Sequence, residues 1–237
     1  PTCMQGGFQG IVGEYAQYEK AVDVFRTGKG RPWGDHHSCL FCGTDRFFKP
    51  GYNANLIENW IPSLEGVDGK LKKGGKAADI GCGFGSSTIL MAKHYPNSVI
   101  HGFDFHEPSI IEARTRAEKD GISNIEFHVS DASAIPNNGY DLACIFDALH
   151  DMGDPVGAAA SIRNALNEDG TFMVVEPLAE DDLKDNQNIL ASVFYGFSTL
   201  ICVPTSKSQN IGLGLGAQAG QKRLTEVLNE AGFSKVR

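Results

Sequence analysis

Three glycines and three aspartates stand in this sequence where they could bind a small organic ligand. Gly81, Gly83 and Gly85 alternate directly after the apolar residues 77–80 and before an amphipathic segment. Glycines at such a turn let the backbone approach a ligand closely, and the free N–H groups of a helix that begins near Ser86 attract a carboxylate or phosphate. The turn therefore predicts a cradle for a nucleotide-like ligand with an anionic end.

The aspartates narrow the class of ligand. Asp104 and Asp131 each end a predicted strand, where they suit a pair of ribose hydroxyls and an exocyclic amine. Asp79, two residues before the first glycine, would repel a pyrophosphate and favour an ammonium group. Ser86 stands where the dinucleotide fingerprint has its third glycine. Together these residues favour S-adenosylmethionine over NAD, although each acid taken singly could be a strand-end cap.

The same residues resemble the successive cofactor motifs of the class I S-adenosylmethionine-dependent methyltransferases, over about residues 76–233. The resemblance implies that S-adenosyl-L-methionine is the cofactor. The residues that it implies for cofactor binding are Asp79, Gly81, Cys82, Gly83, Gly85, Asp104, Phe105, Asp131, Ala132 and Asp147.

A histidine and a glutamate are the candidates for catalysis. His150 follows the fourth predicted strand and Glu176 ends the fifth, which resembles the His-Asp step and the orienting glutamate of plant-type and related bacterial small-molecule O-methyltransferases. Imidazole, with a pKa of about 6.5, can accept a hydroxyl proton while a carboxylate fixes its tautomer. The sequence thus predicts methyl transfer to a hydroxyl group of a small molecule with His150 as general base. Alternatives are that His150 only lines the cofactor pocket, an N- or C-methyltransferase, a cofactor-binding regulatory protein without turnover, and an NAD-dependent oxidoreductase.

The region before residue 76 supplies candidates for acceptor binding. It resembles the segment that precedes the nucleotide domain in bacterial winged-helix methyltransferases, a subgroup that includes mycobacterial members. Aromatic rings mixed with His and Asn suit the wall of a flat acceptor, and a packed interdomain contact would use the same residue types. The predicted substrate-binding residues are Trp33, His36, His37, Tyr52, Asn55 and, from a long predicted helix that could form a lid, Tyr195. Although His36, His37, Cys39 and Cys42 are zinc-type ligands, no second pair follows at zinc-finger spacing, and we expect no metal.

Composition sets the remaining expectations. The chain has 237 residues, with 21 Lys and Arg against 29 Asp and Glu and a formal net charge of −8, so nucleic acid is an unfavourable substrate. Six scattered cysteines in a chain without a recognisable signal sequence indicate free thiols and a cytoplasmic protein. We find no apolar run near the ~20 residues that span a bilayer, and expect no membrane contact. The sequence leaves open whether the protein forms a homodimer.

Alternating strands and helices must position these residues. The pattern predicts an α/β fold, a Rossmann-like, doubly wound and mainly parallel sheet with helices on both faces, an N-terminal helical segment (residues 1–75) and a methyltransferase domain (residues 76–237). We expect helices over residues 6–26, 52–61, 181–202 and 218–231, loops over 27–51 and 212–216, and a linker over 69–76. The chain stops where the resembled family continues into two more strands. We therefore expect part of a longer protein, in which the apolar strand 171–175 is not a free edge.

Overall fold

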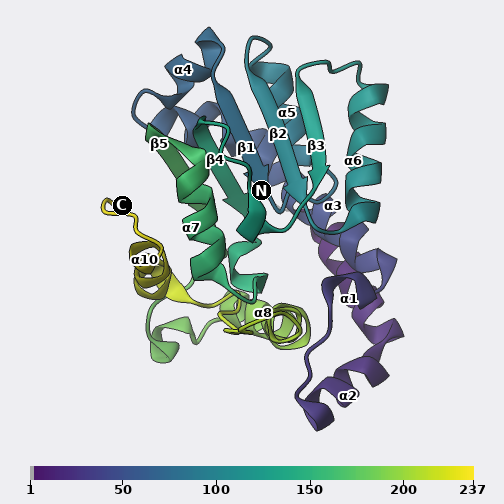
Figure 1. Ribbon diagram of the computed structural model, residues 1–237. Helices are drawn as coiled ribbons and strands as arrows, with labels where there is room; N and C mark the ends of the chain where they lie inside the picture. The colour runs from purple at the N-terminus through teal and green to yellow at the C-terminus, as the bar shows by residue number, and fades with distance from the viewer. Residues whose placement is uncertain (1–2) are drawn as a thin grey trace.

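The computed structural model describes residues 3–237 and centres on a five-stranded, all-parallel sheet (Figure 1). Its strands are β1 (Lys76–Ile80), β2 (Val99–Asp104), β3 (Ile125–Val129), β4 (Tyr140–Phe146) and β5 (Leu166–Val175). They lie in the order β3-β2-β1-β4-β5, so the strand order reverses between β1 and β4. The predicted Rossmann-like α/β fold is confirmed, with β3 and β5 at the edges of the sheet.

Ten α-helices surround the sheet within the described residues. They are α1 (Met4–Ala16), α2 (Tyr18–Thr27), α3 (Ser38–Asn55), α4 (Val67–Lys73), α5 (Ser86–His94), α6 (Glu107–Lys119), α7 (Pro155–Ala165), α8 (Ile189–Phe197), α9 (Val203–Lys207) and α10 (Gly220–Glu230). Two π-helical turns, η2 (Leu56–Trp60) and η7 (Ser198–Cys202), continue α3 and α8.

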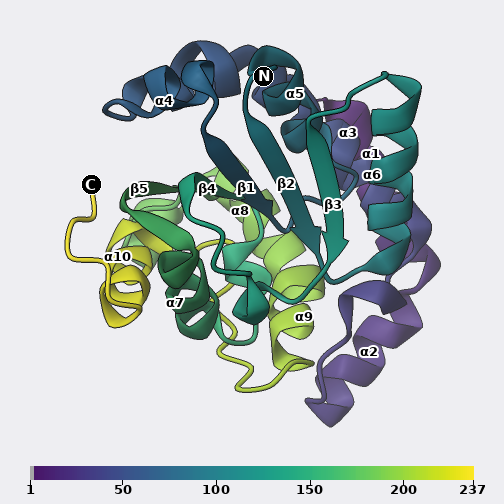
Figure 2. The ribbon, with the colours of Figure 1, turned by 45° about the horizontal axis from the view of Figure 1, so that its top comes forward.

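Both faces of the sheet carry an apolar core, as expected for a parallel sheet. Leu71, Met91 and Tyr95 pack with strand residues on the face covered by α4 and α5, and Ile162 of α7 packs with Ile80 on the other. Figure 2 shows α7 and α10 on the opposite side of the sheet from α4 and α5. Since residues of η2 and α4 belong to the first core, the N-terminal elements share a core with the nucleotide-type sheet.

The predicted loop over residues 27–51 is wrong in its second half, where α3 begins at Ser38. Glycines, Pro50 and aromatic residues made this stretch look irregular, because their helix propensity is low. In the structure Gly43 lies against α1, and a Cβ there would be 2.7 Å from backbone atoms of Gly6 and Gly10. The glycines therefore permit a close helix crossing, and packing outweighs local propensity. The predicted linker over 69–76 is likewise mostly the helix α4.

The long helix expected over residues 181–202 is displaced towards the C-terminus. Asn188 caps it by accepting a hydrogen bond from the Ala191 N–H, and the helical stretch then runs from Ile189 to Lys207. Its mean hydropathy is 1.5, so by length and composition alone it could cross a membrane. The expectation that no apolar run reaches that length is wrong here. A single such helix is weak evidence, because core helices of water-soluble proteins pass the same test.

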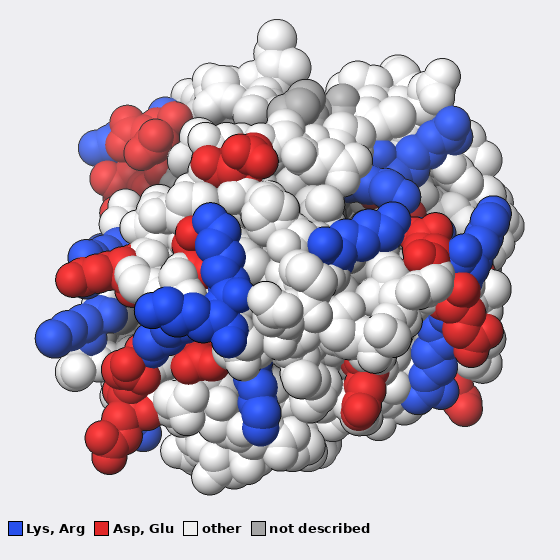
Figure 3. Space-filling model, turned by 90° about the horizontal axis from the view of Figure 1, so that it is seen from above, with Lys and Arg blue, Asp and Glu red and all other residues white. Residues whose placement is uncertain are grey.

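Charged side chains of both signs are interspersed on the face shown in Figure 3. Ion pairs of the described residues include Lys70 with Asp169 at 2.7 Å and Lys93 with Asp120 at 2.8 Å. Exposed pairs of this kind contribute little to stability. The helices and loops at the opposite, carboxyl ends of the strands enclose the candidate site.

Candidate active site

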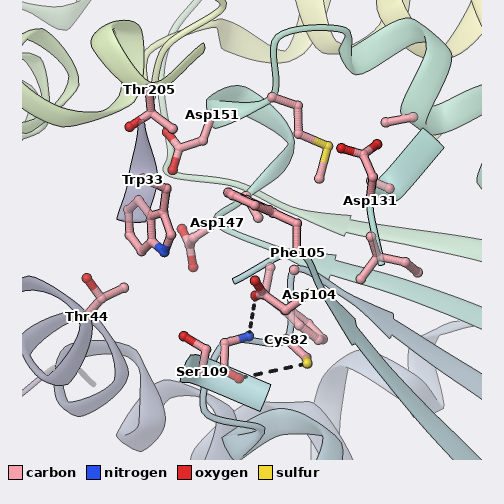
Figure 4. A pocket seen from close by; sticks show the side chains of 18 of the residues that line it. Trp33, Thr44, Cys82, Asp104, Phe105, Ser109, Asp131, Asp147, Asp151 and Thr205 are labelled. Atoms are coloured by element: carbon pink, nitrogen blue, oxygen red, sulfur yellow. Dashed lines mark hydrogen bonds between the residues drawn. The ribbon is translucent and has the colours of Figure 1, made fainter. Parts of the chain in front are cut away.

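A cavity of about 650 Å³ lies at the carboxyl ends of the strands, at the point where the strand order reverses. Parallel α/β sheets bind ligands at this point because the loops after the strands diverge there. The loops after β1, β2, β3 and β4 form its floor, α3 forms one wall, and residues 205–211 form another. Figure 4 shows Asp131 on one side of this cavity, with Trp33, Asp147 and Asp151 on the other.

The glycine turn after β1 has the backbone that its sequence predicts. Gly81, Gly83 and Gly85 all have positive φ, at 71°, 52° and 74°. Only the first two line the cavity. A Cβ on Gly81 would lie 2.8 Å from the Cβ of Ala148, whereas one on Gly85 would meet the ring of Phe127. Gly85 thus serves the packing of α5, and the first two glycines bring backbone towards the cavity.

Asp104 ends β2 inside the cavity and is 8% exposed. Its carboxylate accepts hydrogen bonds from the N–H groups of Gly83 at 2.9 Å and His106 at 2.8 Å. Burial raises the pKa of Asp104, and these two hydrogen bonds partly offset that shift. A carboxylate has about four acceptor positions, so Asp104 keeps capacity for hydroxyl groups of a ligand.

The other predicted cofactor residues divide into cavity-lining and buried groups. Cys82, Phe105, Asp131, Ala132 and Asp147 line the cavity. The carboxylate of Asp131 accepts a hydrogen bond from the Ser133 N–H at 2.8 Å and is exposed at the rim.

Asp79 is fully buried in the sheet and does not line the cavity. Its Oδ2 accepts hydrogen bonds from the hydroxyls of Ser87 at 2.6 Å and Thr88 at 2.7 Å. Its Oδ1 has no partner within the described residues. In this structure Asp79 therefore fixes the start of α5 against β1. Because Asp79 does not line the cavity, its carboxylate is not in the position that the predicted contact with an ammonium group requires.

Asp79 should make the stability of the ligand-free protein fall as the pH rises. Burial raises its pKa from 3.8 to about 6, although the bonds from Ser87 and Thr88 lower it. The folded state therefore holds a proton that the unfolded chain releases, which stabilises the protein at low pH and is lost between about pH 4 and 6. The effect is on the order of 3 kcal/mol. Urea unfolding at pH 4 and pH 7 should show this loss in the wild type and not in Asp79→Asn. Equal losses in both proteins would contradict it.

His150, Glu176 and Asp151 form a chain of contacts that leads from the interior to the cavity. The ring of His150 is 4% exposed, and its Nδ1 is hydrogen-bonded to Glu176. The other carboxylate oxygen of Glu176 accepts a hydrogen bond from the Leu149 N–H at 2.9 Å. The Nε2 of His150 lies 3.2 Å from Oδ1 of Asp151. Asp151 lines the cavity, whereas His150 does not. The predicted pairing of His150 with Glu176 is thus present, with Asp151 between the ring and the cavity.

Burial and neighbouring charges have opposing effects on the pKa values of His150 and Asp151. Burial alone would lower the pKa of His150, but the carboxylates of Glu176 and Asp151 hold it well above its usual value. Burial raises the pKa of Asp151, while the nearby His150 lowers it. The two carboxylates thus favour the protonated form of His150, which opposes its use as a general base.

Asp147 follows β4 in a strained backbone conformation, with φ of 50°. Non-glycine residues in this region are uncommon, with Asp and Asn among the most tolerant. Its carboxylate has neither a hydrogen bond nor an ion pair among residues 3–237. Burial, followed by the charge of Glu176, holds the pKa of Asp147 well above its ordinary value. Strained, unpaired polar residues of this kind gather at functional sites.

Only two of the six predicted substrate-binding residues, Trp33 and Tyr52, line the cavity. His36 instead binds Glu14 at 3.0 Å and lies 3.4 Å from the hydroxyl of Thr205, so it joins α1 to α9. His37 caps α3, because its ring accepts the Cys39 N–H. The side chain of Asn55 bonds to the Gly51 carbonyl within α3, and Tyr195 is half-buried outside the cavity.

Other lining residues were not among the sequence candidates. They include four side chains of α3, an acid after β4, a threonine of α9 and the residues that follow α9, namely Phe41, Thr44, Asp45, Phe48, Asp151, Thr205 and Ser208–Ile211. The His-Asp step contained the signal for Asp151. Phe41 was hidden because its segment was taken as a loop, and nothing local in residues 205–211 indicates that they reach the cavity.

Comparison with known proteins places these features in context. Residues 71–232 match a family model described as "Methyltransferase domain". The chain is 27% identical over 176 residues to sterol 24-C-methyltransferase erg-4 of Neurospora crassa, covering 73% of this chain and 43% of that protein. It is 26% identical over 143 residues to the ubiquinone biosynthesis O-methyltransferase of Acinetobacter baylyi, covering 58% and 54%. The chain thus spans about half the length of these relatives or less.

A solved structure shares the fold along nearly the whole chain. A putative O-methyltransferase from Nostoc punctiforme superimposes with a TM-score of 0.69 at 17% identity, covering 97% of this chain and 66% of that one. The similarity includes the N-terminal helices as well as the sheet. At 17% identity this similarity shows a shared fold and nothing about function.

Proposed function

Since the chain belongs to the family of S-adenosylmethionine-dependent methyltransferases, we propose that it transfers a methyl group from S-adenosylmethionine to a hydroxyl group of a small-molecule acceptor. The cavity at the carboxyl ends of the strands carries this proposal. Its volume of about 650 Å³ is within the usual range of small-molecule sites. The same cavity is large enough to place an acceptor beside a cofactor.

The lining fits a positively charged cofactor. Within the described residues it holds six aspartates and no Lys, Arg or His side chain. A dinucleotide with its pyrophosphate would meet unfavourable charge there. We assign Asp104 to the ribose hydroxyls, Asp131 to an exocyclic amine, and the backbone at Gly81 and Gly83 to the carboxylate end, because all four residues line the cavity. When bound, the cofactor supplies an electrophilic methyl group.

Asp151 is the residue we propose to accept the proton of the hydroxyl. It lines the cavity, and its carboxylate can take a proton directly from a bound acceptor. His150, held by Glu176, lies behind it as a positioning residue, and its positive charge lowers the pKa of Asp151 against the effect of burial. This modifies the interpretation from sequence alone, in which His150 itself is the base. The change follows from the buried ring and the two carboxylates beside its nitrogens.

The aromatic wall supports an acceptor with a flat apolar body. The rings of Phe48 and Tyr52 lie 6.5 Å apart and nearly parallel, and the ring of Tyr52 is 5.2 Å from that of Phe146. All three line the cavity with Trp33 and Phe41. Such surfaces bind flat ligands through apolar contact and ring stacking.

A screen of phenolic acceptors with S-adenosylmethionine tests this function. We expect mass spectrometry to detect a methylated phenol together with an equal amount of S-adenosylhomocysteine. Cofactor binding without methylation of any hydroxyl, amine or carbon acceptor would instead favour a regulatory protein without turnover. Methylation of amine or carbon acceptors alone would leave the family assignment intact and contradict the hydroxyl acceptor.

A further inference from the structure

We propose that the acceptor side of the cavity recognises a positively charged group, such as a substituted ammonium, held between the carboxylate of Asp147 and the ring of Trp33. The acceptor would then be an aromatic compound that carries a cationic amine. This inference rests on the proposed function, since it concerns the acceptor of that same site, and it assigns to the acceptor a residue, Asp147, that the sequence resemblance implied for cofactor binding. It does not depend on which atom of the acceptor is methylated.

Among the described residues, Asp147 is the one lining carboxylate with neither a side-chain hydrogen bond nor an ion pair, although Oδ1 of Asp151 also lacks a hydrogen bond. Of the other five, two make ion pairs, with Arg116 and with His150, and three accept backbone N–H groups. These five are Asp45, Asp151, Asp104, Asp131 and Asp154. The Asp147 side chain is half-buried at the wall of the cavity, so its carboxylate is available to pair with a bound cation.

The described lining residues of the cavity offer no cation of their own. No Lys, Arg or His of the described residues lines it. Arg116 lies over the ring of Phe84 in the glycine turn at 4.8 Å and is paired with Asp45 at 2.9 Å. An acceptor with a carboxylate or phosphate would meet only like charge beside Asp147, whereas a cationic acceptor meets complementary charge.

Asp147 and the residue proposed for adenine lie on different sides of the cavity. Figure 4 shows Asp147 next to Trp33, with Asp131 on the other side of the cavity. A cation against the face of Trp33 and next to a carboxylate gains both cation–π and ionic attraction.

Two phenols of the same shape test this inference. The probes are 4-hydroxyphenyltrimethylammonium and 4-tert-butylphenol, titrated calorimetrically below the pH at which either phenol ionises, with and without saturating S-adenosylhomocysteine. That product has no charged sulfur, so the cofactor contributes no sulfonium charge. The quantity compared is the ratio of the two affinities, which cancels the apolar contribution common to both probes.

We expect Asp147→Asn to lower the ratio of cation affinity to neutral affinity by about tenfold or more. Asparagine tolerates the positive φ of this position and has the same shape, so the backbone should be kept. Asp131→Asn is the matched control, because it removes a carboxylate from the opposite side of the same cavity and should leave the ratio unchanged.

The inference is overturned if Asp147→Asn keeps the wild-type ratio, or if Asp131→Asn lowers it equally. The proposed function is judged separately, from the binding of S-adenosylhomocysteine to the wild type. A lowered affinity ratio in Asp147→Asn, together with normal binding of S-adenosylhomocysteine to the wild type, supports both the cationic acceptor and the proposed function. An unchanged ratio with normal binding rejects the cationic acceptor and leaves methyl transfer untouched.

Discussion

Asp151→Asn should lower the rate of methyl transfer by roughly 10²–10⁴-fold, the usual contribution of a positioned general base. The amide has nearly the shape of the carboxylate but cannot accept the hydroxyl proton. Affinity for S-adenosylhomocysteine should change little, because the loss falls on proton transfer. Single-turnover rates and calorimetry on the same samples measure the two quantities. Asp154→Asn is the matched control, since its carboxylate is used to cap α7 and asparagine caps equally well.

His150→Gln separates a positioning role from a purely structural one. The charge of His150 lowers the pKa of Asp151, so its removal should raise that pKa. Only the ionised carboxylate accepts a proton, so the rate rises as the pH passes through the pKa of Asp151. In His150→Gln this rise should move to higher pH, with a smaller loss of rate at high pH. A rise at the same pH as in the wild type would show that His150 does not act through Asp151.

A wild-type rate of methyl transfer in Asp151→Asn would contradict the role of Asp151 and would require another base.

Asp104→Asn should weaken binding of S-adenosylhomocysteine by roughly tenfold to hundredfold. Hydrogen bonds to a charged group contribute about 1.5–3 kcal/mol, and the proposed ribose contacts fall on this carboxylate. The substitution also alters the bonds from Gly83 and His106, so the midpoint of thermal unfolding should be recorded with the affinity. Asp131→Asn, at the exposed rim, should weaken binding less. Equal affinities for the wild type and Asp104→Asn would contradict the position assigned to the ribose.

The parts of the site that sequence predicted are those fixed by strand ends. Gly81, Asp104 and Asp131 line the cavity because parallel strands bring the residues that follow them to one edge of the sheet. Asp79 could not be placed in this way. Its contacts are hydroxyls of residues eight and nine positions later, and they depend on how α5 packs against β1.

The acceptor side was harder to predict because it is built by packing between distant segments. Gly43 and Pro50 suggested a loop, yet helix α3 forms there and places Phe41 and Phe48 in the cavity. His36 looked like a lining residue, but its partner Glu14 lies on another helix and holds it away from the cavity. Neither contact leaves a local signal in the sequence.

Calorimetric titration of the wild-type protein with S-adenosylhomocysteine and with NAD tests the central claim most directly. The cavity combines the acid proposed to bind the ribose, Asp104, with five further aspartates and no cationic side chain among its described lining residues. We therefore predict that S-adenosylhomocysteine binds with one-to-one stoichiometry and that NAD neither binds comparably nor displaces it. Tighter binding of NAD, or displacement of S-adenosylhomocysteine by NAD, would contradict the assignment of this cavity to a methyltransferase cofactor.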